Sequence, residues 1–266
     1  MTHTSSAASQ THRPRGWLTA VCLILVLVAA SLARTGIAPS GATAEPPQLP
    51  KASDADLLPF DSAEPDWYAA VQENIRQSEY HVTWQEQTGL PDLPAAYQAP
   101  NRAHNLRTYF DAEGIRIVPR TELMPTWSLS LALDGFSATQ PTIAGNQVTY
   151  RHDAPVGLSL EYVNDEQGLQ QKITLTGSLD SAHGTGEAIL ALSLDGALAP
   201  RLADDGLSIT YVDTGSVERL QQGALVVADA MGRALPACLR TQSYSEDLPA
   251  TSGKVEIAID LSLIHI

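Results

Sequence analysis

Short stretches of alternating apolar and polar residues recur from Tyr80 to Ile259, and they restrict the fold more than any other feature. Alternation with a period of two places apolar side chains on one face of a β-strand. Turn-forming clusters of Gly, Asn, Asp and Pro separate the stretches, and segments such as Asp111–Gly114 join neighbours at hairpin spacing. We expect strands at Tyr80–Glu86, Leu106–Phe110, Ile115–Pro119, Trp127–Leu133, Gln147–Arg151, Leu158–Val163, Leu169–Thr176, Ile189–Leu194, Ser208–Val212, Val217–Leu220, Ala224–Val227 and Val255–Ile259.

Many short strands without long helical patterns between them predict an all-β fold, an antiparallel β-sandwich or barrel, of which we expect the sandwich. One short helix precedes the strands. Trp67, Val71 and Ile75 recur at every fourth position over Asp66–Ser78, and Pro65 supplies a start signal.

A faint internal repeat lies among the expected strands. Leu129–Gly135 resembles Leu190–Gly196, 61 residues later, because both alternate Leu with small residues and end in Asp-Gly. Two stacked, related sandwich units, each burying the apolar face of the other, would account for the repeat. Chance similarity is the alternative.

The N-terminus has the features of an export segment. Arg13 and Arg15 precede an apolar run from Trp17 to Ala33, and small-residue cleavage motifs follow at Ser31–Ala33 and Ala42–Ala44. This order predicts a secretory signal peptide over residues 1–44. An uncleaved membrane anchor is the alternative, because the apolar run is at the lower limit of spanning length. Both interpretations place residues 45 onward outside the cytoplasm, in a secreted or cell-surface protein.

Residues 45–65 are rich in Pro, Ala, Ser and Asp without apolar periodicity, so we expect a disordered linker between the export segment and the strands.

Residues 1–44 hold three of the 16 basic residues and none of the 30 acidic ones, which leaves a net charge of −17 on the remainder. Such a surface repels nucleic acid and anionic membranes. The sequence does not identify the partner: an extracellular protein and a glycan both fit this surface, and we expect membrane contact only through an uncleaved N-terminal segment.

The sequence contains no recognisable catalytic constellation. Gly157–Glu161 begins like the Gly-x-Ser-x-Gly motif of serine hydrolases but lacks its last Gly. Cys238 lies between apolar residues, which is typical of a small buried side chain. Cys22 lies in the apolar run, so a processed chain would have no internal disulfide. The histidines lack metal-ligand spacing. We therefore predict no enzyme, no cofactor and no catalytic, cofactor-binding or metal residue.

Acidic turns and aromatic residues are the remaining candidates for binding. Asn164–Gly168, Asp204–Gly206 and Asp54–Asp56 supply oxygen atoms but lack the spacing of a calcium loop, so we interpret them as two turns and a linker segment. Paired carboxylates or an exposed aromatic row would instead favour a carbohydrate-active or carbohydrate-binding module. We expect four aromatic residues to be core residues or half-buried strand residues: Trp84, Tyr97, Trp127 and Tyr162.

Residues 261–266 resemble the in-frame translation of a transposon mosaic-end sequencing adapter. We expect the natural reading frame to differ after Asp260 and the region 66–260 to belong to a longer protein. The fragment would then lack its closing strand and have an unpaired sheet edge. A natural extension of the strand Val255–Ile259 is the alternative.

Four segments resemble the N-terminal region of large bacterial surface proteins that carry FG-GAP (integrin-α-like) repeats. They are Gln98–Phe110, Glu113–Arg120, Tyr162–Gln171, which is similar to the family's YVND-x-x-GLEQ, and Gly232–Leu239, which is similar to its GRALPARL. Gln170 replaces the usual Glu, and Cys238 replaces the usual Arg. The resemblance covers about residues 80–260 and implies a structural or adhesive β-sandwich module at the head of a surface protein.

Overall fold

The computed structural model of the chain describes residues 21–27, 65–122, 124–136, 139–152, 157–176, 186–243 and 252–261. Residues 45–64 of the expected linker, which include Asp54–Asp56, lie outside this part of the chain, as do His183 and residues 262–266; Pro65 is the first residue of the helix. The elements are β1 (Val21–Leu27), α1 (Pro65–Ser78), β2 (Thr83–Gln85), β3 (Ala96–Asn101), β4 (Leu106–Phe110), β5 (Ile115–Pro119), β6 (Leu129–Leu133), β7 (Thr142–Ala144), β8 (Gln147–His152), β9 (Gly157–Asp165), β10 (Gly168–Thr176), β11 (Glu187–Gly196), β12 (Ala199–Leu202), β13 (Ile209–Val212), β14 (Glu218–Gln222), β15 (Leu225–Asp229), β16 (Ala237–Ser243) and β17 (Ser252–Asp260).

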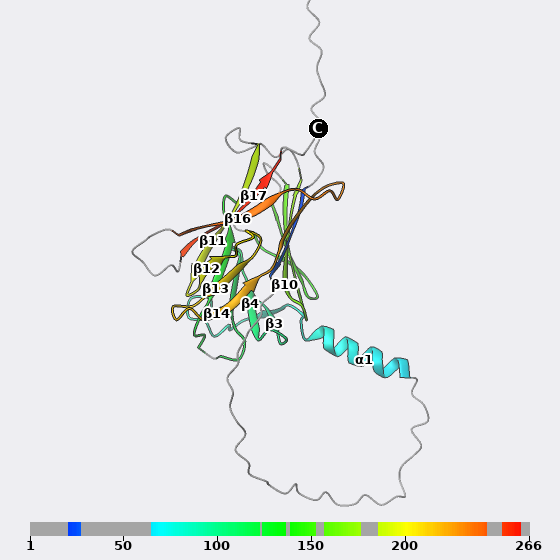
Figure 1. Ribbon diagram of the computed structural model, residues 1–266. Coiled ribbons are helices and arrows are strands. Elements are labelled where there is room, and N and C mark those ends of the chain that lie inside the picture. Colours follow the sequence, from blue (N-terminus) through cyan, green and yellow to red (C-terminus); the bar gives the residue numbers. More distant parts are fainter. Residues whose placement is uncertain are drawn as a thin grey trace, which may run out of the picture.

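Two antiparallel sheets pack face to face, which confirms the expected β-sandwich (Figure 1). One sheet has eight strands in the order β16-β17-β11-β6-β5-β4-β3-β2, and the other has six in the order β15-β1-β10-β9-β8-β7. A third sheet, β12-β13-β14, has three strands. It contacts the larger sheet through β16 and the smaller one through β1. The apolar residues of the alternating stretches therefore form the inner faces of the two sheets.

The repeated Leu segments are neighbours in one sheet, and not two stacked units. They form β6 and β11, which pair antiparallel with Leu194 opposite Leu131 and Gly196 opposite Leu129. Gly196 is needed there because a Cβ at this position would lie 2.2 Å from the carbonyl oxygen of Ser128. Both copies therefore contribute to the same core, because in an antiparallel pair the residues directly opposite each other share a face.

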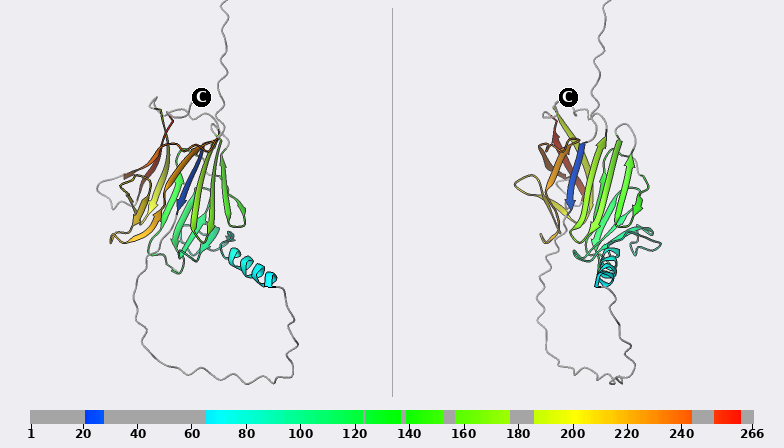
Figure 2. Two further views of the ribbon diagram at one scale, coloured as in Figure 1. Left: turned by 45° about the vertical axis from the view of Figure 1, so that its right-hand side comes forward. Right: turned by 90° about the vertical axis from the view of Figure 1, so that its right-hand side faces the viewer.

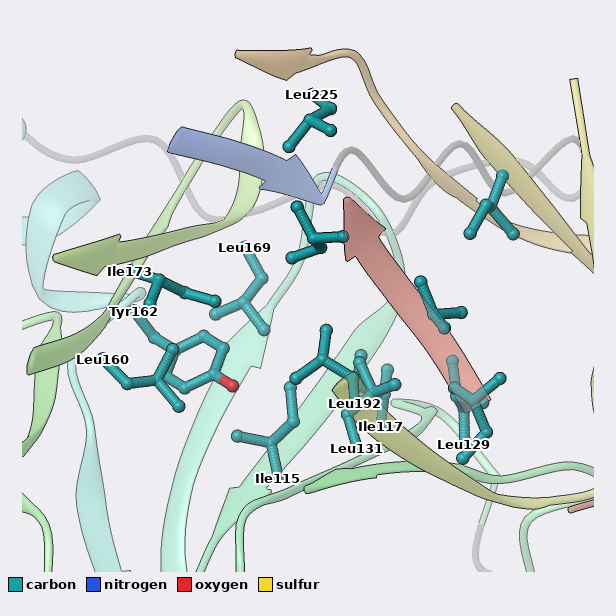
Figure 3. Packing of buried hydrophobic residues seen from close by; sticks show 14 of the residues in the cluster. Ile115, Ile117, Leu129, Leu131, Leu160, Tyr162, Leu169, Ile173, Leu192 and Leu225 are labelled. Carbon is teal, nitrogen blue, oxygen red and sulfur yellow. The ribbon is translucent and has the colours of Figure 1, made fainter. Parts of the chain in front are cut away.

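The core is one cluster of buried apolar side chains from all three sheets (Figure 3). Leu129, Leu131, Leu192 and Leu194 are at most 3% exposed, and Leu133 and Leu190 pack against the cluster from its margin. Tyr162 lies among them with its ring edge-on to Phe110, at a centroid distance of 5.7 Å. A smaller cluster on the outer face of the larger sheet joins Ala96, Tyr109 and Val118. These positions confirm that the Leu residues two apart share a buried face.

The structure adds strands that alternation did not indicate, and two of them contain proline. Pro200 lies on β12, an edge strand of the three-stranded sheet. Pro100 lies on β3 opposite Arg107 of β4, beyond the residues of β3 that pair with β2. Proline is tolerated at such positions because no neighbouring strand needs its missing N–H.

The helix predicted at Asp66–Ser78 is present as α1, and it extends from one end of the sandwich (Figure 1). Its apolar residues remain largely uncovered, since Trp67 is 61% exposed and Ile75 51% exposed. Within the described residues, no helix is both long and apolar enough to cross a membrane.

Part of the predicted export segment is a strand of the smaller sheet. β1 lies between β10 and β15 and is antiparallel to both, with Leu23 opposite Ile173 on one side and Val227 on the other. Figure 2 shows β1 in blue within this sheet. The sequence predicts that this apolar run is a signal peptide or membrane anchor outside the β-sandwich. Its pairing with β10 and β15 is a structural finding that the local sequence pattern does not indicate.

Candidate functional site

A polar cavity of about 290 Å³ lies between α1 and the turn from β9 to β10. Its wall includes Glu73, Arg76 and His81 from α1 and the segment after it, and Asp165 and Glu166 from the turn. The Arg76 guanidinium donates to Glu166 at 2.7 Å and to both carboxylate oxygens of Glu73 at 3.0 Å. The single positive charge of Arg76 is shared by two carboxylates, and its bond to Glu166 ties the exposed helix to the sandwich.

Buried and half-buried asparagines lie next to this cavity and connect the two sheets. The asparagine cluster consists of Asn101 on β3, Asn146 between β7 and β8, and Asn164 on β9. The Asn101 Nδ2 donates to Asn164 Oδ1 at 2.9 Å and to the carbonyl oxygen of Asp165 at 2.7 Å. The Asn146 Nδ2 donates to the carbonyl oxygen of Asn164 at 2.8 Å. The cluster therefore joins β3 of the larger sheet to β9 of the smaller one.

Asn164 makes the most contacts in the asparagine cluster and is 1% exposed. Its Nδ2 donates to the carbonyl oxygens of Tyr80 and Pro100, both at 2.9 Å. A buried amide with all of these bonds satisfied specifies one arrangement of its neighbours. The sequence places Asn164 in an acidic turn and in a segment that resembles the FG-GAP family. It does not predict the role of Asn164, because a local pattern does not show that a side chain reaches two distant backbone segments.

The acidic turns use their carboxylates to hold the backbone. Asp165 Oδ1 accepts from the backbone N–H of Gln167, and Asp205 Oδ1 accepts from that of Leu207, both at 2.8 Å. Asp111 Oδ1 accepts from the N–H groups of Glu113 and Gly114. This is how Asp stabilises tight turns, as the sequence interpretation expected. In the described part of the chain, no group of three or more His, Cys, Asp or Glu residues could hold a metal ion.

Two further acidic turns combine backbone contacts with an arginine. The Asp213 Oδ1 accepts from the N–H of Val217, and its Oδ2 accepts from Arg219 at 2.7 Å. These contacts lower the pKa of Asp213, the backbone bond from Val217 most. In the same way, the backbone bond and the guanidinium of Arg233 lower the pKa of Asp229, although burial opposes them. A carboxylate with a lowered pKa does not act as a proton donor near neutral pH.

Three of the four aromatic residues are placed as expected, and one is not. Trp127 and Tyr162 are buried, and burial raises the pKa of the Tyr162 hydroxyl. Tyr97 is half-buried and packs against the core. Trp84, which we expected to be buried or half-buried, is 53% exposed, because β2 is the edge strand of the larger sheet. Its ring lies edge-on to Tyr97 at a centroid distance of 5.0 Å.

The residues considered for covalent chemistry occupy structural positions. Gly157–Glu161 lies within β9, where the Ser159 hydroxyl donates to Glu161 at 3.4 Å. Cys238 is a free, partly exposed thiol on β16, so the expectation of a fully buried residue is wrong. The contacts described for these residues thus do not form a nucleophile–base pair.

Comparison with protein-family models, curated proteins and solved structures finds no match to this chain.

Proposed function

We propose that this chain is an exported, non-catalytic β-sandwich module that serves a structural or adhesive role in a larger bacterial surface or secreted protein of the FG-GAP type. The observation that supports this function most is that the carboxylates of the acidic turns accept hydrogen bonds from the backbone of the turns. Asp111, Asp165, Asp205, Asp213 and Asp229 all bind the backbone of their own turns, so these carboxylates serve the scaffold.

A scaffold of this kind suits a structural role at the cell surface. The two sheets share one continuous apolar core, and the asparagine cluster fixes their relative position. Loops held on a rigid sandwich can present a constant surface to a partner. The acidic surface keeps such a module soluble outside the cell.

Export is the part of the proposal that can be tested first. A reporter that is active only outside the cytoplasm would be fused after Asp260, and we expect activity from the intact chain. In the matched control, Leu25→Arg interrupts the apolar run, and activity should be lost. An inactive reporter on the intact chain, with the protein retained in the cytoplasm, would refute the proposed location.

The exposed Trp84, paired with the half-buried Tyr97, supports glycan binding as a second candidate function. Trp84 and Tyr97 lie directly opposite each other on β2 and β3, at the edge of the larger sheet. An exposed indole supported by a second ring offers an apolar surface against which the face of a sugar ring can pack. We propose a small saccharide as the ligand of this pair.

Tryptophan fluorescence would test this second function, with a panel of oligosaccharides titrated into the purified chain. Trp84→Ala should abolish any saturable change. Trp67→Ala is the matched control, because Trp67 is also exposed but lies on α1 away from Tyr97. Binding that survives Trp84→Ala would exclude the aromatic pair as the site.

A further inference from the structure

The strand β15 depends on β1 for its place in the smaller sheet. β1 pairs with β10 through seven residues, Val21–Leu27, and with β15 through five, Val21–Leu25. Among the described strands, β15 has no other ladder partner. The backbone N–H groups of Leu225 and Asp229 are bonded on the side away from β1. The N–H groups of Val226 and Ala228 therefore point toward β1, because successive residues of a strand bond in opposite directions. We call the space that β1 occupies the β10/β15 slot.

The β10/β15 slot has the pattern of a strand with one buried face. On β10, the buried residues Leu169, Gln171, Ile173 and Leu175 alternate with the more exposed Gln170, Lys172 and Thr174. A strand between β10 and β15 should alternate in the same way. The sequence of β1, VCLILVL, is apolar at every position, including the residue opposite Lys172. A strand with alternating apolar and polar residues would therefore match the buried and exposed faces of the slot better than the uniformly apolar β1 does.

Unsatisfied polar atoms lie beside the slot. Gln171, which is opposite Leu25, is 0% exposed; its Nε2 donates to the Tyr162 hydroxyl, but its Oε1 has no partner. β14, which contacts β1, contains Gln222, whose buried Nε2 is also unpartnered. An unpaired buried polar group is costly, and native structures rarely leave one. A strand with a hydrogen-bonding side chain opposite Gln171 would satisfy the orphan carbonyl.

The end of β17 lies at the end of the slot where β1 begins (Figure 2). The backbone N–H of Asp260 donates to Pro236 at 2.9 Å, and the neighbouring Leu235 donates to Val227 of β15. The N–H of Leu261 donates to Gly186, which follows the connection from β10. A chain that reverses its direction after Leu261 would enter the slot at its Val21 end and run in the direction of β1.

We propose that the β10/β15 slot is a strand-acceptor site, and that the strand following Leu261 in the natural protein replaces β1 there. That strand is extended, apolar toward the core and polar toward solvent, with a hydrogen-bonding side chain opposite Gln171. The inference rests on the proposed export, because removal of residues 1–44 is what leaves the slot to another strand. The N-terminal segment then holds β15 in place only until it is processed.

Disulfide trapping of Cys22 would report which strand occupies the slot. Cys22 lies opposite Ala228, so Ala228→Cys in a Cys238→Ser background places two thiols in adjacent strands. The natural gene would first be sequenced past codon 260 without a transposon adapter. The 266-residue chain and the natural full-length chain would then be purified with the N-terminal segment intact. We expect a Cys22 cross-link in the 266-residue chain and its loss in the full-length chain.

A control and a second readout complete the test. Val217→Cys in the same background, in the turn before β14, should not cross-link to Cys22. A protease site within residues 45–50 would release the N-terminal fragment from the full-length chain but not from the 266-residue chain. Equal cross-linking in both chains, a fragment that stays bound to the full-length chain, or a stop codon directly after Ile266 would overturn the inference. These results do not depend on the export reporter, so failure of export would be seen separately.

Discussion

Removing the Asn164 side chain should destabilise the protein more than most single polar substitutions. In Asn164→Ala, three hydrogen bonds are lost, each 2.9 Å long and made by a side chain that is 1% exposed. An intramolecular hydrogen bond contributes about 0.5–1.5 kcal/mol net, and a buried partner left unsatisfied costs about 1–3 kcal/mol. Because the carbonyls of Tyr80 and Pro100 lose their donor together, we expect a loss of about 3–5 kcal/mol in the free energy of unfolding.

Urea unfolding, followed by circular dichroism, would measure this loss. The matched control is Asn146→Ala, which removes one side-chain bond of a half-buried asparagine and should cost about 1 kcal/mol. Equal losses for the two variants, with unchanged dependence on urea, would refute the argument that Asn164 joins the sheets.

Asn164→Asp adds a pH dependence of defined sign. The introduced carboxyl would be buried against two carbonyl oxygens, so its pKa in the folded state is raised above the ordinary value of about 3.9. Stability should therefore be greatest below that ordinary value and fall as the pH rises through the raised pKa. A variant whose stability is independent of pH would contradict this reasoning.

The remaining predictions concern the core, the slot and the acidic turns. Leu131→Ala should lower the free energy of unfolding by about 2–5 kcal/mol, because Leu131 is buried in the core. Val226→Ala, which changes an exposed side chain, should lower it by less than about 1 kcal/mol. Equal losses for the two variants in urea unfolding would contradict the described core. Leu23→Gln should lower the melting temperature more than Leu25→Gln, because only position 25 lies opposite the orphan glutamine carbonyl of β10; the reverse order in calorimetry would count against the slot. The pKa of Asp229 is lowered from 3.8, so its contribution to stability is present above that value and is lost as the pH falls through the folded-state pKa. Unfolding measured against pH should show this loss in the natural chain and a smaller one in Asp229→Asn.

Local pattern predicted the strands well where apolar and polar residues alternate. β4 and β5 have the expected bounds, and α1 differs by one residue at its start. The sequence does not predict β3 and β12, because proline is typical of turns. Pro100 and Pro200 can lie on strands here because no neighbouring strand requires a hydrogen bond from their missing N–H. β1 was missed because uniform apolar character is equally typical of an export segment.

Partners distant in sequence could not be predicted, because alternation defines the face of a strand but not its neighbour. This explains why β6 and β11 were expected to stack and are instead adjacent. It also explains Trp84, whose exposure follows from the edge position of β2. Asn164 lies within a segment that resembles the FG-GAP family, yet its role depends on Tyr80 and Pro100, which only the folded chain brings near.

The pairing of β1 with β15 also determines when the smaller sheet can be completed during synthesis. Val21 pairs with Asp229, 208 positions later in the chain. At a synthesis rate of about 5–20 residues per second, the apolar segment waits about 10–40 s for this partner. Neighbouring strands such as β9 and β10 pair within about 1–10 μs of becoming available. The N-terminal segment therefore remains without its β15 partner through most of translation.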